Sequence, residues 1–173
     1  DNIMGQPVER PPEKRFLHRP DLKGKITFEK VSFSYPQVKR KVLDNVSFSI
    51  NAGEKIGIIG RIGSGKSTIA RLMMNLYEPD EGTISADDTD YRQIDPADLR
   101  RRMAYIAQDV VLFSGTVRDN ITASVPHATE EAILEAAKIS GVHEFIARHP
   151  MGYDAPVGEA GQGLSGGQRQ AVA

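Results

Sequence analysis

Residues 60–68 read GRIGSGKST and match the pattern G-x-x-x-x-G-K-[ST] of phosphate-binding loops. The glycines let the backbone turn tightly and approach an anion without a Cβ in the way. Successive backbone N–H groups then point inward, at the positive end of the helix that follows. The stretch KIGIIG at residues 55–60 is typical of a strand buried on both faces, and residues 66–77 carry apolar side chains at helical spacing. The stretch therefore predicts a nucleotide site between a strand and a helix.

Within this pattern, Lys66 is expected to reach the β and γ phosphates, and the Ser67 hydroxyl is expected to ligate Mg²⁺. The alternative is a glycine-rich strand-to-helix turn that binds no ligand. The buried-type strand before the loop and the amphipathic helix after it favour nucleotide binding. The residues predicted to contact the nucleotide are Gly60, Arg61, Ile62, Gly63, Ser64, Gly65, Lys66, Ser67 and Thr68.

The composition is that of an ordinary water-soluble globular domain of 173 residues, with 39% hydrophobic and 26% charged residues and a net charge of −1. This balance gives no reason to expect nucleic-acid binding. The chain has no cysteine, which excludes disulfides and thiolate chemistry. No apolar run approaches the roughly 20 residues of a membrane-spanning helix. Because the chain opens at Asp1 without an initiator Met, we expect it to be a piece of a longer protein.

The strand pattern begins after a proline-rich, charged segment, residues 1–24, which is expected to be an extended linker. Residues 26–35 alternate with a one-residue phase change, which indicates a bulge or two short strands. Further strands are predicted at residues 46–50 and 83–85, and a buried one in MAYIAQ at residues 103–108.

Two helix signals follow in the second half of the chain. Asp95, Pro96 and Asp98 are typical of a helix start, with Asp as N-cap, proline in the first turn and an acid three residues on. Residues 129–149 read as helix, broken near Gly141, and strand signals are absent after residue 114.

A second motif, LSGGQ, stands at residues 164–168 and opens a helix with small residues and a serine hydroxyl, a combination suited to a γ-phosphate. Together the two motifs resemble the nucleotide-binding domain of ABC (ATP-binding cassette) transporters, over residues 25–173 and in the family's order. The resemblance implies ATP and Mg²⁺ as ligands, and a head-to-tail dimer of two such domains. Each composite site would then combine Lys66 and Ser67 of one copy with the signature residues of the other, which are Ser165, Gly166, Gly167 and Gln168.

The resemblance also assigns two single residues. Tyr35 is similar to the A-loop aromatic that stacks on adenine, although a core tyrosine at a strand end is the alternative. Gln108 is similar to the Q-loop glutamine that senses Mg²⁺ and the γ-phosphate, so Gln108 and Lys66 are the expected catalytic residues, and Ser67 and Gln108 the expected metal-site residues.

Two stretches resemble exporters in particular: residues 105–121, where such proteins receive the coupling helices of a transmembrane domain, and PVGEAGQG at residues 156–163, which resembles the exporter X-loop. Residues 90–116 resemble most the ATPases of bacterial type I secretion. This implies protein export with a periplasmic adaptor and an outer-membrane channel, from the cytoplasmic face of the bacterial inner membrane. A non-transport ABC ATPase and a nucleotide-binding-only module are the alternatives.

The resemblance stops short of the family's Walker B strand, whose acids bind Mg²⁺ and activate water, and of its switch histidine. We therefore expect these 173 residues to bind nucleotide weakly and not to hydrolyse it. The strands at 55–60 and 103–108 would be left with open edges, which favours association or a swapped element.

The expected fold class is α/β: a P-loop NTPase (RecA-like) core with an antiparallel β subdomain, an α-helical signature subdomain, and a core sheet incomplete at the C-terminus. The expected division places the linker at residues 1–24, the β subdomain and core at 25–113, and the helical subdomain at 114–173.

Overall fold

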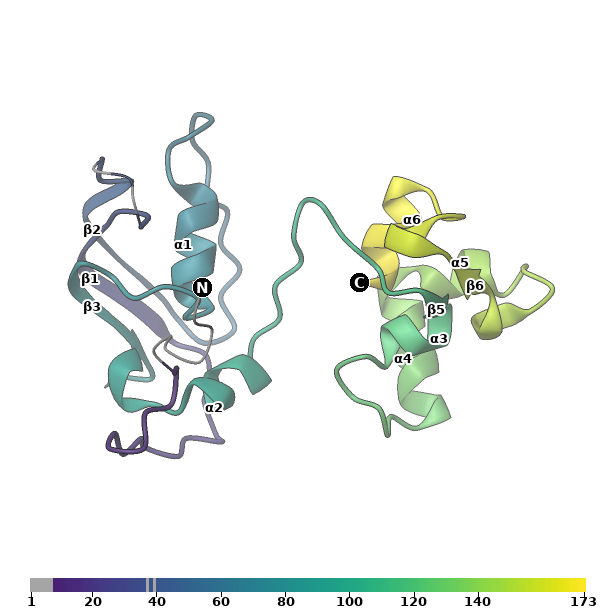
Figure 1. The fold of residues 1–173 in the computed structure, drawn as a ribbon, viewed down its shortest axis with the longest axis horizontal. Helices are drawn as coiled ribbons and strands as arrows, with labels where there is room; N and C mark the ends of the chain where they lie inside the picture. The colour runs from purple at the N-terminus through teal and green to yellow at the C-terminus, as the bar shows by residue number, and fades with distance from the viewer. Residues whose placement is uncertain (1–7, 37, 39) are drawn as a thin grey trace, which may run out of the picture. The chain divides into compact units, whose positions relative to one another are not determined.

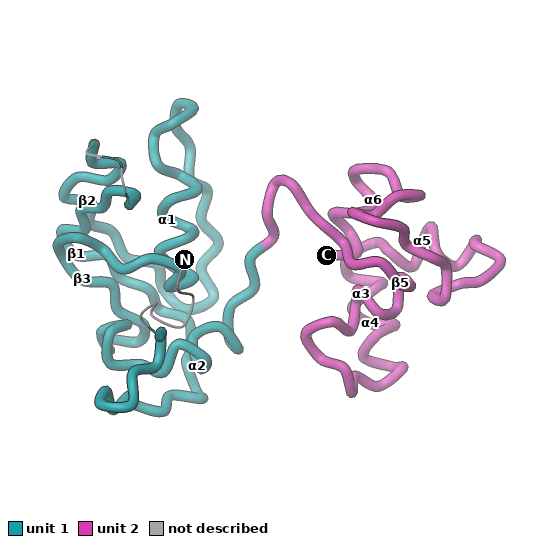
Figure 2. Tube along the Cα trace, in the orientation of Figure 1, with its two compact units in different colours: residues 1–105 teal, residues 106–173 magenta. Residues whose placement is uncertain are grey.

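The computed structural model describes residues 8–36, 38 and 40–173. The chain forms two compact units, whose boundary lies between Tyr105 and Ile106 (Figure 2). Together they form the mixed α/β fold that the sequence predicts, with an antiparallel sheet in the first unit and mainly helices in the second (Figure 1).

Unit 1 is built on a four-stranded antiparallel sheet of order β2-β1-β3-β4. In chain order, its strands are β1 (Ile26–Phe33), β2 (Leu43–Ile50), β3 (Glu81–Ala86) and β4 (Thr89–Asp90). Helix α1 (Lys66–Met73) lies beside the sheet (Figure 1). Its Leu72 belongs to the same buried cluster as Phe28 and Val31 of β1. The predicted strands at 46–50 and 83–85 are confirmed, because each falls within an observed strand.

The phase change predicted in the first strand is a β-bulge in the pairing with β2. The register shifts between Phe28 and Val31, and Lys30 adopts a positive φ of 50°. Opposite the bulge on β3, Gly82 has a φ of 84°, and a Cβ there would collide with the carbonyl oxygens of Glu29 and Lys30. The bulge therefore requires a glycine at this position, because any side chain would push the two strands apart.

The prediction of strands at residues 55–60 and 103–108 is wrong for this structure. Both segments are extended without being part of a ladder, and no described segment pairs with either of them. Ile59 is 99% exposed, and Ile56, Ile58, Tyr105 and Ile106 are exposed as well, whereas Met103 packs against the core of unit 1. A strand persists only where a neighbour satisfies its N–H and C=O groups, and these segments leave their groups to water.

Helix positions agree with the sequence more closely than these strands do. Helix α2 (Pro96–Arg101) begins as predicted, since the Asp95 carboxylate accepts a hydrogen bond from the Ala97 N–H at 2.9 Å. Helix α1 ends at Met73 rather than near residue 77, because Asn75 takes a left-handed conformation with a φ of 52°. A 3-10 turn, η2 (Tyr91–Gln93), connects β4 to α2.

Residues 9–25, called here the N-terminal strap, form no helix or strand of their own and are bound to the rest of unit 1. Leu17 forms a parallel β-bridge with Ile94, donating from its N–H to the Gln93 carbonyl and accepting from the Asp95 N–H. Ion pairs join Glu9 to Arg100 and Arg10 to Asp95. Pro12 and Pro20 lie in turns of the strap, while hydrogen bonds and ion pairs attach it to the region around α2.

Asp98 of α2 is the buried anchor of the strap, with only 2% of its surface exposed. Its carboxylate accepts from the Arg19 N–H at 2.8 Å and lies 2.7 Å from His18 Nδ1. The Arg19 N–H and the nearby His18 and Arg101 side chains hold the pKa of Asp98 below its ordinary value of 3.8, against the opposing effect of desolvation.

Unit 2 is mainly helical. Its helices are α3 (Val117–Ile121), α4 (Glu130–Ser140), α5 (Val142–Ile146) and α6 (Gly166–Val172), with 3-10 turns η3 (Gly152–Asp154) and η4 (Glu159–Gly161). Gly141, with a φ of 81°, separates α4 from α5, which confirms the predicted break. A two-residue ladder of β5 (Gly115–Thr116) and β6 (Pro156–Val157) was not expected from the sequence.

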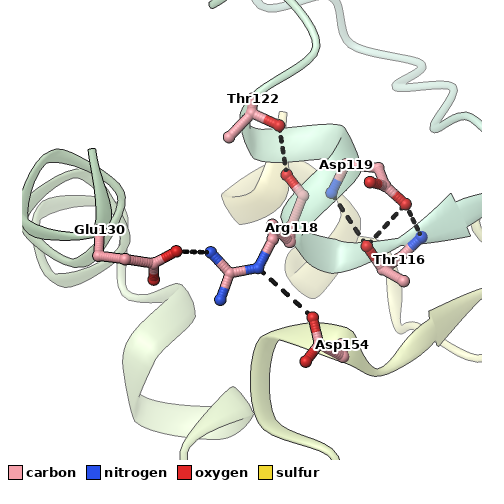
Figure 3. Close-up of polar contacts among 6 residues, drawn as sticks. All are labelled: Thr116, Arg118, Asp119, Thr122, Glu130 and Asp154. Atoms are coloured by element: carbon pink, nitrogen blue, oxygen red, sulfur yellow. Dashed lines mark hydrogen bonds and ion pairs between the residues drawn. The ribbon is translucent and has the colours of Figure 1, made fainter. Parts of the chain in front are cut away.

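Arg118 ties three parts of unit 2 together (Figure 3). Its guanidinium binds Glu130 at the start of α4 at 2.5 Å and Asp154 of η3 at 3.4 Å. Thr116 directly precedes α3 and forms a capping box with Asp119. The hydrogen bonds from Thr116 lower the pKa of the Asp119 carboxyl. The capping box and the ion pairs of Arg118 therefore stabilise the short helix α3.

Candidate functional site

The loop at residues 60–65 leads into α1 through Gly65, which caps the helix with a left-handed φ of 92°. A Cβ on Gly65 would lie 2.7 Å from Leu43 Cδ2 and 3.2 Å from the Val42 carbonyl oxygen. Both the conformation and the space therefore require glycine at this point of the motif. The result is a loop that turns onto the first N–H groups of α1, which have no carbonyl partner within the helix.

Lys66 folds back over the same loop. Its ammonium donates to the carbonyl oxygens of Gly60 and Arg61, at 2.8 Å each. A turn bond from the Ser64 N–H to the Arg61 carbonyl, at 3.2 Å, closes the loop beneath it. The loop therefore presents a positive charge at a helix N-terminus, which is a chemically suitable place for a phosphate group.

Tyr35 lies just after β1 and reaches α1 through its hydroxyl. The Tyr35 oxygen lies 3.0 Å from Thr68 Oγ1 and accepts from Arg71 Nη1 at 2.9 Å. The ring makes edge-to-face contacts with Phe33 and Tyr77, with centroids 5.0 and 5.2 Å away. Tyr35 thus packs against the core, as the alternative interpretation of this residue proposed, and also faces the loop.

These elements enclose a pocket of about 290 Å³, lined by Tyr35, Val42, Gly63, Ser64, Gly65, Lys66, Ser67, Thr68 and Arg71. The charged residues in this lining are Lys66 and Arg71, both cationic, so the pocket favours an anion. The hydrogen bond to Tyr35 raises the pKa of Arg71, which keeps its charge at any pH compatible with folding. The pocket therefore combines an aromatic ring, two cations and a helix N-terminus.

Arg71 was missed by the sequence interpretation. The signal that points to it is its spacing: it lies three residues after Thr68, so both residues fall on one face of α1. A basic residue at that distance from the motif is on its own too common to single out.

The signature residues begin α6 in unit 2. Ser165 is the N-cap, accepting from the Gln168 N–H at 3.3 Å, and the Gln168 side chain accepts from the Ser165 N–H at 2.8 Å. This reciprocal capping box leaves Gly166 and Gly167 exposed in the first turn. The turn is therefore a bare backbone surface with a serine hydroxyl beside it.

Gln108 is exposed and lies near this helix within unit 2. It lines a pocket of about 450 Å³ together with Asp109, Val110, Glu159, Ala160, Gln162, Gly166, Arg169 and Gln170. The structure therefore brings Gln108 together with the 156–163 segment and α6, whereas Lys66, Ser67 and Tyr35 form a separate group in unit 1.

A divalent cation would find few protein ligands near the loop. Ser67 offers a hydroxyl on the exposed first turn of α1, but no group of three or more His, Asp or Glu side chains suited to a metal occurs among residues 8–36, 38 and 40–173. Ser67 fits a single ligand position, and the remaining oxygens would have to come from phosphate, water or another segment.

Comparison with known proteins gives a consistent result. A sequence profile described as ABC transporter matches residues 43–173. The chain is 43% identical over 172 residues to the toxin RTX-I translocation ATP-binding protein of Actinobacillus pleuropneumoniae, covering 99% of this chain and 24% of that protein. It is 41% identical over 172 residues to the leukotoxin translocation ATP-binding protein LktB of Mannheimia haemolytica, with the same coverage.

Two further relatives differ in description. An uncharacterized ABC transporter ATP-binding protein of Bacillus subtilis, YfiB, is 45% identical over 151 residues, covering 87% of this chain and 26% of that protein. The solved structure of a bacterial Atm1-family ABC exporter with ATP bound superposes with a TM-score of 0.81 at 37% identity, covering 93% of this chain and 30% of the other.

The chain spans about a quarter of the length of these curated relatives. Among residues 8–36, 38 and 40–173, no helix has the length and apolar character needed to cross a membrane.

Proposed function

Because this chain belongs to the ABC transporter ATP-binding family, we propose that its unit 1 pocket binds ATP with Mg²⁺ and that the complete protein uses ATP to drive export. The observation that carries the proposal is the position of Lys66, whose ammonium lies over the loop carbonyls at the N-terminus of α1. That arrangement places a cation beside the first N–H groups of the helix, which together suit a polyphosphate.

In this proposal each pocket residue has a separate role. Lys66 exchanges its bonds to the Gly60 and Arg61 carbonyls for bonds to the β and γ phosphates. The Ser67 hydroxyl ligates Mg²⁺, which would screen the phosphate charge. Tyr35 stacks on the adenine base. Gln108 lies in unit 2 and not in this pocket, and we propose that in the complete protein it orients the attacking water or the metal.

The second half of the site is proposed to come from another copy. The first turn of α6 exposes Gly166 and Gly167 beside the Ser165 hydroxyl, so the γ-phosphate of a nucleotide held by one copy can be reached by the signature residues of its partner. Two domains would then enclose two nucleotides head to tail. This arrangement explains why the two motifs lie in different units of the chain.

The transport function is proposed from the relatives and from the surface near Gln108. Two relatives at 41–43% identity are named for translocation of a toxin or a leukotoxin, which supports protein export of the type I secretion class. The complete protein would lie at the cytoplasmic face of the bacterial inner membrane, receive the coupling helices of its transmembrane domain, and act with a periplasmic adaptor and an outer-membrane channel.

Titration calorimetry with MgATP tests nucleotide binding. We expect Lys66→Ala to weaken MgATP affinity at least about tenfold, because it removes a charge-assisted contact to phosphate. Lys138→Ala, which removes an exposed lysine from α4, is the matched control and should bind like the unmodified chain. Equal affinities for the two variants would contradict the proposal.

ATP hydrolysis is a separate question from ATP binding. The acidic pair of Asp87 and Asp88 that follows β3 forms the turn to β4, and no acidic pair follows the apolar segments at residues 55–60 and 103–108. We therefore propose that this chain binds ATP without hydrolysing it. A steady-state phosphate-release assay should stay at background with Mg²⁺ present. Magnesium-dependent release that disappears in Lys66→Ala would contradict this part of the proposal.

A further inference from the structure

We propose that Arg71 is a positioning residue that holds the Tyr35 ring for stacking, so that the base of the nucleotide, and not only its phosphates, contributes to binding. This inference rests on the proposed nucleotide-binding function of unit 1. The observation behind it is a chain of two hydrogen bonds, from Arg71 through the Tyr35 hydroxyl to Thr68.

The direction of this chain follows from the chemistry of its members. A guanidinium can only donate, so the Tyr35 oxygen accepts from Arg71 Nη1 at 2.9 Å. The single proton of the Tyr35 hydroxyl is then free to be donated to Thr68 Oγ1, 3.0 Å away. Thr68 is 4% exposed and belongs to the phosphate-binding motif, so the tether ends on a rigid part of α1.

The tether matters because Tyr35 is not held by a strand. The residue lies two positions beyond the end of β1 at Phe33 and outside the sheet. Its ring is half-buried, contacts Phe33 and Tyr77 by edge-to-face packing, and has the Arg71 guanidinium 5.8 Å from its centroid. Packing on its own leaves the ring free to tilt, whereas a hydrogen-bonded hydroxyl at the far end restricts that motion.

A restricted ring has a predictable effect on affinity. Ordering a side chain on binding has an entropic cost, which is avoided when the side chain is already in place. Arg71 is therefore expected to influence the contribution of the base and to leave the phosphate contacts of Lys66 and the α1 N-terminus unchanged. Its own position on the pocket wall allows a second possibility, direct contact with phosphate, which the experiment separates from positioning.

The experiment compares two probes on the full 173-residue chain: MgATP, and inorganic tripolyphosphate with Mg²⁺, which has the charge but no base. We expect Arg71→Ala and Tyr35→Phe each to weaken MgATP binding by about threefold to tenfold, the range for loss of one or two hydrogen bonds, and to leave tripolyphosphate binding within about twofold. The double variant should be no weaker than either single variant, because both changes break the same tether.

Two controls exclude a merely structural effect. Arg71→Lys should recover part of the MgATP affinity, since an ammonium can also donate to the Tyr35 oxygen. Arg148→Ala removes an exposed arginine from unit 2 and should bind both probes normally.

The outcomes that overturn the inference are distinct. If Arg71→Ala weakens the binding of MgATP and of tripolyphosphate equally, Arg71 contacts phosphate directly. If it weakens the binding of neither probe, Arg71 has no role in binding. If the unmodified chain binds MgATP and tripolyphosphate equally well, the base contributes nothing and only this inference fails. If it binds neither probe, the proposed function fails and this inference fails with it.

Discussion

Strand β1 and residues 55–60 are both apolar, extended segments of unit 1, yet they have opposite fates. β1 pairs with β2 on one side and β3 on the other, and it buries Phe28, Val31 and Phe33. Residues 55–60 contain three isoleucines and pair with no described segment, so their side chains lie in solvent. The difference teaches that apolar content makes a strand possible, whereas a neighbour for the backbone makes it form.

The N-terminal strap supports the same conclusion from the other direction. It is polar and rich in proline, but it forms a β-bridge through Leu17 and is anchored at Asp98, because the Gln93–Asp95 backbone and the buried carboxylate provide partners. Backbone pairing therefore orders the polar strap, whereas the apolar residues 55–60, which have no pairing partner, do not become a strand.

The largest effect that we expect is a change in the free energy of unfolding, and it separates β1 from residues 55–60. Phe28→Ala should lower the free energy of unfolding by about 3–5 kcal/mol, because it leaves a cavity in a packed core. Ile59→Ala, also a large-to-alanine change, should alter it by no more than about 0.5 kcal/mol, because the side chain is exposed. Urea unfolding followed by circular dichroism gives both values.

A loss for Ile59→Ala close to that of Phe28→Ala would break the comparison. It would mean that residues 55–60 are buried in solution, for example against a second copy of the chain. Concentration dependence of the unfolding midpoint would then identify such association.

The anchor of the strap predicts a pH effect. The folded-state pKa of Asp98 lies below 3.8, so its carboxylate stabilises the fold fully above about that pH and loses the contribution as pH falls through the lower folded-state pKa. As pH falls from about 4 to about 2, the unmodified chain should therefore lose more stability than Asp98→Asn, which has no such proton to gain.

Asp109→Asn is the matched control, since Asp109 is an exposed carboxylate of unit 2. Its acid sensitivity should equal that of the unmodified chain in the same urea titrations. An identical pH profile for Asp98→Asn and the unmodified chain would show that Asp98 does not anchor the strap.

The smallest expected effect comes from an unpaired group inside the well-packed region. The Tyr91 hydroxyl is buried and finds no hydrogen-bond partner among the described residues, and its burial raises its pKa above the ordinary value of 10. Tyr91→Phe should therefore raise the free energy of unfolding by about 1 kcal/mol, since it removes a desolvated polar atom.

Tyr153→Phe provides the contrast for that measurement. The Tyr153 hydroxyl lies 3.0 Å from His143 Nδ1, so its removal should lower the free energy of unfolding by about 1 kcal/mol or less. If both variants lower the free energy of unfolding, the Tyr91 hydroxyl has a hydrogen-bond partner in solution, such as a buried water.

The parts of the molecule that were predictable from the sequence are those governed by local rules. The Asp95 cap, the break at Gly141 and the left-handed Gly65 follow from the conformational preferences of single residues. The bulge in β1 follows from side-chain alternation, because one extra residue shifts the buried face. Arg71 was not predictable, because its role depends on contact with Tyr35, 36 residues away in the chain.

The sequence by itself determined the motifs of this protein, a glycine loop with Lys66 and Ser67 and a signature turn at Ser165, and the family to which both belong. Only the tertiary structure decided which extended segments became strands, how the strap is bound at Asp98, and that Arg71 and Thr68 hold Tyr35. The physical reason is that caps and turns are satisfied within a few residues, whereas strand pairing and side-chain tethers need partners brought together by the fold.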